Sequence, residues 1–272
     1  MRRSLCFAIL FVVAAHLYAA GPERQQPAAT AEKQRPQFRP AVLPFGADSL
    51  VNRIDAQALM TAGQKDGAVM FCAVVAPNGD VKQSRTYRGM PGTAALEEEV
   101  RKRMQGAKFT PAIYNHQPVG VVASGTVFFS ITNDKPHIRL FLNQDGKELK
   151  EENDFVAPQP VFGADSPFTG YDYPTDVAVQ VNAVVDMRVI VDASGNPRAM
   201  RVIGEEPPLL GFAMVAAKDF NGAKFIPAFR AGEAVECDVD FPVCYQPADW
   251  ATPSFAPPRE ALGNLADPLN PP

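Results

Sequence analysis

Hydrophobic and polar positions follow two different spacings along residues 53–131. Helical spacing without internal proline or glycine predicts a helix at 54–62, and apolar residues at every fourth position predict a second helix, capped by Thr93 and ending near Gly106. The turn residues Asn78-Gly79 tolerate the positive φ of a tight hairpin. Runs rich in β-branched and aromatic residues predict strands at 68–75, 81–87 and 119–131, and a strand at 138–142 that folds back on the third.

The second half of the chain repeats this order of elements. Its pattern predicts helices at 175–181 and 209–220 and strands at 184–191, 199–203 and 234–245. The stretch GAKFTPA at 106–112 returns as GAKFIPA at 222–228, a shift of 116 residues. A period this long indicates a duplicated domain rather than a solenoid. We therefore predict an α+β fold of two tandem α-β-β-α-β units, each a short antiparallel sheet packed with helices.

Segments of different composition bound the two predicted units, which span 45–142 and 162–246. The charged residues between the units predict a solvated connector at 143–161. Proline-rich segments flank the pair, and they predict a poorly ordered linker at 21–44 and a disordered tail at 247–272.

Residues 1–20 have the composition of a secretory signal peptide. Arg2 and Arg3 precede the apolar run 5–15, and small residues follow near Ala20. The run is shorter than the roughly 20 residues that span a bilayer. We expect cleavage and a periplasmic protein; the alternative is an uncleaved inner-membrane anchor that contains His16 and faces the periplasm.

The formal net charge of −4 gives no indication of a basic patch, so nucleic acid is not an expected partner. After the signal peptide, only His116 and His137 remain, and neither has the spacing of a metal ligand. The sequence has no Gly-x-Ser-x-Gly elbow, phosphate loop or dinucleotide fingerprint. We therefore expect no enzyme activity, no metal site and no small-molecule cofactor.

Three cysteines follow the signal peptide: Cys72, Cys237 and Cys244. Seven steps along one strand separate the last two by about 23 Å, whereas a disulfide needs Cα atoms within about 7 Å. A Cys237–Cys244 disulfide is therefore not expected. Three buried thiols are the favoured interpretation, and the redox state of all three stays open.

In the second unit, VIVDASG at 189–195 contains a predicted strand that ends in a Val-Asp-x-x-Gly turn, and AKFIPA at 223–228 follows the predicted helix. These motifs resemble the C-terminal domain of TonB-type energy transducers. Asp172, Tyr173 and Pro174 match the family's Tyr-Pro motif, with aspartate in place of the usual glutamine. The first unit matches through VVAPNG at 74–79 and KFTP at 108–111 but lacks Tyr-Pro.

Six residues are assigned structural roles in the two units. Glycines allow the hairpin turns, aromatic residues fill the space between helix and last strand, and prolines stop the helices and turn the chain back. These residues are Gly79, Phe109 and Pro111 in the first unit and Gly195, Phe225 and Pro227 in the second.

The resemblance implies a binding mode, because in this family an exposed sheet edge receives an extended peptide from an outer-membrane transporter by strand addition. In the first unit the strand at 138–142 is expected to cover that edge. In the second unit the edge is expected to be free, although Pro242 removes one donor. The predicted peptide-binding edge consists of Ala234, Val235, Glu236, Cys237, Asp238, Val239, Asp240 and Phe241.

The expected function is that of an exported, TonB-like periplasmic module that binds extended segments of partner proteins. The partner would be an outer-membrane transporter or a second copy of this chain. One alternative is a membrane-anchored energy transducer acting on TonB-dependent transporters. The short linker argues against this alternative, because residues 21–44 extended as polyproline span only about 75 Å. The other alternative is a purely structural or oligomerisation module.

Overall fold

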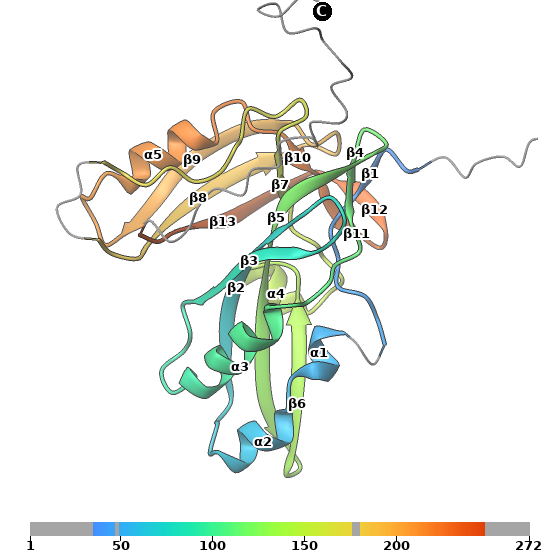
Figure 1. The fold of residues 1–272 in the computed structure, drawn as a ribbon, viewed down its shortest axis with the longest axis vertical. Helices are drawn as coiled ribbons and strands as arrows, with labels where there is room; N and C mark the ends of the chain where they lie inside the picture. Colours follow the sequence, from blue (N-terminus) through green and yellow to red (C-terminus); the bar gives the residue numbers. More distant parts are fainter. Residues whose placement is uncertain (1–34, 47–48, 176–179, 248–272) are drawn as a thin grey trace, which may run out of the picture. The chain divides into compact units, whose positions relative to one another are not determined.

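A computed structural model describes residues 35–46, 49–175 and 180–247 (Figure 1). The predicted signal peptide, residues 21–34 of the predicted linker and almost all of the predicted tail lie outside these ranges. Most of the helix predicted at 175–181 is also outside them, and the described residues Thr175, Gln180 and Val181 are not helical. No helix in the described ranges is long and apolar enough to cross a membrane.

The longest strand, β5 (Gln117–Thr132), organises an antiparallel sheet of eight strands. On one side β5 pairs with β2 (Gly67–Val75), which pairs in turn with β3 (Val81–Tyr87). On its other side β5 pairs in succession with three shorter strands, and two more extend the sheet from there. These five are β4 (Ala112–Tyr114), β7 (Gln159–Phe162), β6 (Lys135–Phe141), β1 (Phe38–Arg39) and β10 (Phe225–Ile226).

A second antiparallel sheet has β8 (Ala183–Val191) between β9 (Pro197–Glu206) and β13 (Cys237–Tyr245). The strands β11 (Ala228–Arg230) and β12 (Glu233–Val235) form a separate hairpin. In Figure 1, α5 (Phe212–Asp219) lies along β9 and β8, and α3 (Ala94–Met104) lies along β3. The remaining helices are short: α1 (Leu50–Arg53), α2 (Ala56–Thr61) and α4 (Gly146–Glu151).

The predicted fold class was wrong. The described part of the protein is mostly β, with 43% of the described residues in strands and 17% in helices, and one sheet has eight strands rather than a few short ones packed with helices. The additional strands β1, β7 and β10 come from proline-containing segments. They join the sheet through backbone hydrogen bonds. Segments this short contain too few residues to show the alternation of apolar and polar side chains that marks a strand in a sequence.

Residues 35–44 were predicted to belong to a poorly ordered linker, but they are part of the fold. Phe38 and Arg39 pair with Tyr114 and Ile113 in β4. Ala41 is fully buried, and the Gln159 side-chain amide binds both its N–H and its carbonyl oxygen at 2.8 Å. Part of the predicted linker therefore contributes to the first sheet.

The residue predicted to cap a helix and the prolines predicted to stop the helices have other roles. The Thr93 hydroxyl donates to the Met90 carbonyl oxygen at 2.6 Å and does not cap α3, although Thr93 is the residue before the helix. The helices α3 and α5 end at Met104 and Asp219. Pro111 and Pro227 follow several residues later in extended chain, so they do not stop the helices.

The turn glycines Gly79 and Gly195 have φ values of 87° and 76°, as the hairpin prediction required. The structure adds a second constraint on each. A Cβ atom at Gly79 would lie 2.1 Å from the Phe109 carbonyl oxygen, and one at Gly195 would lie 2.0 Å from the Phe225 carbonyl oxygen. Each glycine is held there because its own carbonyl accepts the N–H of that phenylalanine, at 2.8 and 3.0 Å.

The two halves of the chain have separate cores that meet in the first sheet. Phe109 is buried in one core and Phe225 in the other. Side chains of β2 alternate between them: Phe71, Ala73 and Val75 belong to the first core, whereas Cys72 and Val74 belong to the second. Because successive residues of a strand point to opposite faces, β2 is buried on both sides and joins the two halves.

Candidate functional site

The predicted peptide-binding edge at 234–241 is divided between two elements. Ala234 and Val235 belong to β12, where they pair with Phe229 and Ala228 of the hairpin. Cys237 to Phe241 belong to β13, which pairs with β8 on one side. Among the described residues no strand pairs with the other side of β13, so its outer edge is confined to 237–245.

The outer edge of β13 offers few backbone donors. The Asp240 N–H points away from β8, since it donates to the Asp145 carboxylate at 3.0 Å. The register with β8 is regular, and N–H directions alternate along a regular antiparallel ladder. Asp238, Pro242 and Cys244 therefore share this outward direction, and Pro242 has no N–H to donate.

Asp145 binds β13 and the helix α4 at the same time. One carboxylate oxygen accepts the N–H groups of Lys147 and Glu148 at 2.9 and 3.1 Å, which caps the helix. The other oxygen accepts from Asp240. The segment predicted as a charged, solvated connector at 143–161 is thus folded: it contains α4 and most of β7, and Asn143, Gln144 and Asp145 are buried.

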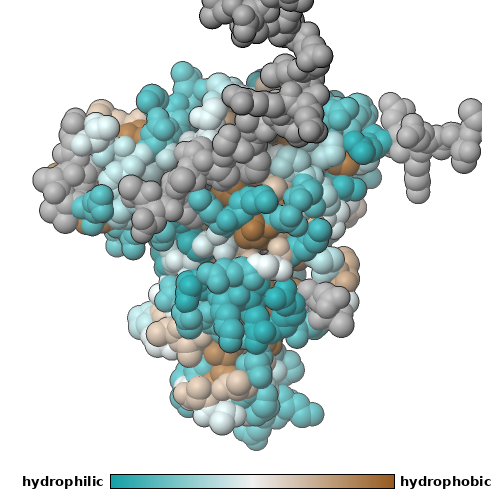
Figure 2. Space-filling view, in the orientation of Figure 1, coloured by the Kyte–Doolittle hydropathy of each residue, from teal (hydrophilic) through white to brown (hydrophobic). Residues whose placement is uncertain are grey.

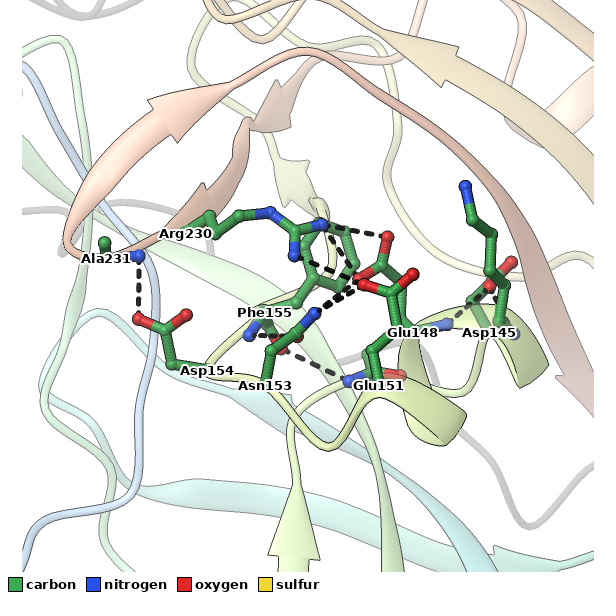
Figure 3. Close-up of polar contacts among 10 residues, drawn as sticks. Asp145, Glu148, Glu151, Asn153, Asp154, Phe155, Arg230 and Ala231 are labelled. Atoms are coloured by element: carbon green, nitrogen blue, oxygen red, sulfur yellow. Dashed lines mark hydrogen bonds and ion pairs between the residues drawn. The ribbon is translucent and has the colours of Figure 1, made fainter.

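Figure 3 shows how the charged residues of this segment hold the hairpin. The Arg230 guanidinium donates to both carboxylate oxygens of Glu148, at 2.9 and 2.8 Å, and lies 5.0 Å from the centre of the Phe155 ring. Asp154 accepts the Ala231 N–H at 2.7 Å. These contacts fix the hairpin that leads directly into β13.

The exposed face of β13 carries paired charges. The Arg188 guanidinium on β8 binds Asp238 at 2.5 Å and Asp240 at 3.0 Å. These two carboxylates hold the pKa of Arg188 above its usual range, and Arg188 lowers the pKa of Asp238. Glu236 lies 3.5 Å from Arg198 on β9. A peptide added at this edge would have mutually neutralised charges beside it.

The Tyr-Pro motif has structural contacts. The Tyr173 hydroxyl donates to the Val181 carbonyl oxygen at 2.8 Å and accepts the Val181 N–H at 2.9 Å, while its ring packs edge-to-face against Phe212. The Asp172 carboxylate accepts from Lys218 at 3.0 Å. The motif therefore fastens the segment before β8 to α5, and it does not contact β13 through these bonds.

Sequence reasoning missed a large apolar groove with a volume of about 930 Å³. The N-terminal segment 36–46 forms one wall, and α1, residues 140–142, residues 153–156 and the hairpin residues Phe229 and Gly232 form the others. Phe45, on its rim, is fully exposed. In the orientation of Figure 1, the surface is largely hydrophilic and carries small hydrophobic patches (Figure 2). The apolar residues Phe38, Val42, Leu43 and Phe45 were a sequence signal for this groove, and the prolines among them favoured a linker interpretation instead.

Across the described ranges, no group of three or more His, Cys, Asp or Glu side chains is arranged to hold a metal ion. Comparisons with protein-family models, with curated proteins and with solved structures found no match. The likeness to TonB C-terminal domains therefore rests on the sequence motifs alone.

Proposed function

We propose that this chain is an exported protein-interaction module that binds an extended peptide by strand addition to Cys237–Phe241 of β13. The asymmetry of the two sheets carries the proposal. β5 has strands on both sides, whereas β13 has a strand only on the β8 side among the described residues. A strand with one unpaired edge provides backbone donors and acceptors for an added peptide.

Asp145 acts as a competitor in this proposal. Its carboxylate occupies the Asp240 N–H, the position that a peptide carbonyl would take. An incoming peptide exchanges one acceptor for another there, and it gains bonds at Asp238 and at the outward carbonyl groups. The edge is thereby protected from indiscriminate pairing until a partner of sufficient affinity arrives.

The partner class follows from the TonB resemblance, which favours a segment of an outer-membrane transporter or a second copy of this chain. Periplasmic localisation is part of the same proposal. The membrane-anchored transducer and the purely structural module are its alternatives. A mature N-terminus near Ala20 or Gly21, measured by mass spectrometry of the exported protein, would exclude the anchored alternative.

Substitution at Asp240 tests strand addition most directly. Asp240→Pro removes an outward N–H and leaves the ladder to β8 intact, whereas a proline at Val239 would break that ladder. A fluorescein-labelled peptide of alternating valine and lysine serves as the probe, with affinity read by anisotropy. We expect Asp240→Pro to weaken binding at least about tenfold and Glu236→Ala to leave it unchanged.

Asp145→Asn should have the opposite effect on peptide affinity. Its remaining oxygen can still cap α4, but its amide nitrogen cannot accept from Asp240. The released N–H should tighten peptide binding by roughly 3–10-fold, the worth of one backbone hydrogen bond. Equal affinity in wild type, Asp240→Pro and Asp145→Asn, with all three folded, would exclude β13 as the binding edge.

The apolar groove supports a second candidate function, the capture of an apolar ligand or apolar segment. Its volume is in the range of small-molecule sites. Leu43→Asp should abolish the fluorescence increase of 1-anilinonaphthalene-8-sulfonate if the groove binds the dye. Met214→Asp is the control, since Met214 is 77% exposed on α5 and does not line the groove. Equal dye fluorescence in both variants would exclude the groove.

A further inference from the structure

The strand β6 has an outer edge that faces away from β5. The Ile131 N–H of β5 donates to the side chain of Asp66, the residue before β2, at 2.9 Å, so it points away from β6. The register between β5 and β6 is regular, and N–H directions alternate along an antiparallel ladder. The odd-numbered residues of β6 therefore bind β5, and the even-numbered residues direct their N–H and carbonyl groups outward.

The contacts of the even-numbered residues agree with this direction. The Leu142 carbonyl, just after β6, accepts the Ala157 N–H at 2.9 Å, on the side away from β5. Pro136 has no N–H to donate. Within the described ranges, the outward backbone groups of Ile138 and Leu140 have no hydrogen-bond partner. These two residues form a short open edge between Pro136 and the chain at Ala157.

The two faces of β6 differ in chemistry. Ile138 and Leu140 are half-buried against the first core, and Leu140 lines the apolar groove together with Leu43. Lys135 and Arg139 are exposed. Because successive side chains of a strand point to opposite faces, β6 presents an apolar face beside the groove and a cationic face to solvent.

The positive charge of the exposed face is only partly compensated. Arg139 forms an ion pair with Glu152 and lies 5.8 Å from the centre of the Phe128 ring. Lys135 follows the exposed turn residue Asp134, and no ion pair of Lys135 is present among the described residues. On β13, by contrast, one arginine contacts two aspartates. The exposed face of β6 therefore favours a partner with acidic side chains.

We propose that an extended segment of a partner protein, in which apolar and acidic residues alternate, adds antiparallel to β6 and lies in the groove. A residue opposite Leu140 exchanges two backbone hydrogen bonds with it, and its apolar side chain faces the groove beside Leu43. The next residue lies opposite Arg139, where a cross-strand pair of opposite charges is stabilising. The inference rests on the groove as the second candidate function and is independent of β13.

N-methylated peptides test this pairing without altering the protein. The probe is a fluorescein-labelled peptide of alternating valine and glutamate, with affinity read by anisotropy. Its valines donate their N–H groups to β6, whereas the N–H groups of its glutamates point away. N-methylation of the valines should weaken binding at least about tenfold, and N-methylation of the glutamates should weaken it far less. Equal losses, or no binding of the unmodified probe, would overturn the inference.

Substitutions separate this site from β13. Arg139→Gln should weaken binding of the valine–glutamate probe roughly 2–5-fold, and the matched control Arg198→Gln on β9 should leave it unchanged. Leu43→Asp should abolish it, because a carboxylate then lies where a valine side chain packs. Asp240→Pro should have no effect.

Two outcomes distinguish failure of this inference from failure of the functions proposed above. Loss of probe binding in Asp240→Pro, with none in Leu43→Asp, would assign the peptide to β13 and overturn addition to β6. Dye binding that Leu43→Asp abolishes, in a protein that does not bind the probe, would leave the groove as an apolar site and overturn the proposed peptide.

Discussion

Gly79 and Gly195 differ from other turn glycines in what lies beside them. Gly79, Gly195 and the comparison residue Gly232 all have positive φ, a conformation that costs a residue with a Cβ about 1–2 kcal/mol. Gly232 has a φ of 82° and open space around it, whereas a Cβ at Gly195 would lie 2.0 Å from a backbone oxygen. That oxygen belongs to the chain of Phe225, which is fixed in the core and cannot withdraw.

We predict that Gly195→Ala and Gly79→Ala each destabilise the protein by about 2–3 kcal/mol more than Gly232→Ala does. Urea unfolding at constant pH measures the difference. Equal losses in all three variants would mean that positive φ alone limits these positions, and that contact with the phenylalanine carbonyl is unimportant.

The raised pKa of the Asp219 carboxyl group predicts that the stability of the fold depends on pH. Burial raises the pKa of its carboxyl group to about 6, although the Asp172 N–H and the Tyr245 hydroxyl donate to it and Lys218 is nearby. The folded state therefore holds a proton that the unfolded state releases near pH 3.8. The stability from this proton is complete below pH about 4 and is lost as pH rises through 6.

The comparison with Asp219→Asn isolates that contribution. We expect the free energy of unfolding of wild type, minus that of the variant, to fall between pH 4 and pH 6 and to level off above pH 7. Guanidinium unfolding at each pH gives both values. A difference that rises over this interval would show that hydrogen bonding, rather than desolvation, dominates at Asp219.

At the scale of elements, α4 and its capping residue bind both the β11–β12 hairpin and β13. Its residue Glu148 is only 12% exposed and accepts two bonds from Arg230, and its capping residue Asp145 holds β13. Removing the cation leaves a nearly buried carboxylate with the Asn153 amide as a remaining donor but without a counter-charge, which is costlier than losing a surface ion pair.

We predict that Arg230→Ala lowers the free energy of unfolding by about 1–2 kcal/mol. The matched control is Arg198→Ala, whose side chain is 62% exposed and lies 3.5–3.6 Å from its two carboxylates. That control should cost less than about 0.5 kcal/mol. Similar losses in urea unfolding would show that α4 is held by packing rather than by Arg230.

For the whole molecule, the shared core predicts cooperative unfolding. β2 and β5 contribute Cys72, Val74 and Val122 to the core of the second half, and Arg88 binds Asp186 of β8 with two bonds of 2.8 Å. Opening the second half exposes one face of the first sheet to water. The halves should therefore lose their structure together.

Differential scanning calorimetry should give one transition whose van't Hoff and calorimetric enthalpies agree. Phe225→Ala, which removes a fully buried ring from the second core, should cost about 3–5 kcal/mol and lower that single transition. Two resolved transitions, with only one of them shifted by Phe225→Ala, would show that the halves are independent.

The sequence by itself determined the elements that carry a strong side-chain pattern. The strand at 81–87 has the predicted bounds, and β2, β8 and α3 lie within a few residues of their predictions. Phe109 and Phe225 are buried as expected, and β6 folds back on β5. In each case the prediction depends on which apolar side chains must be buried, and their pattern can be seen directly in the sequence.

Only the tertiary structure decided how strands from distant segments combine. β1, β7 and β10 pair through backbone groups that nearly every residue possesses, so the sequence predicted an α+β fold and missed an eight-stranded sheet. The same reason applies at the candidate site. That Asp145 would bind the Asp240 N–H depends on packing between segments 95 residues apart.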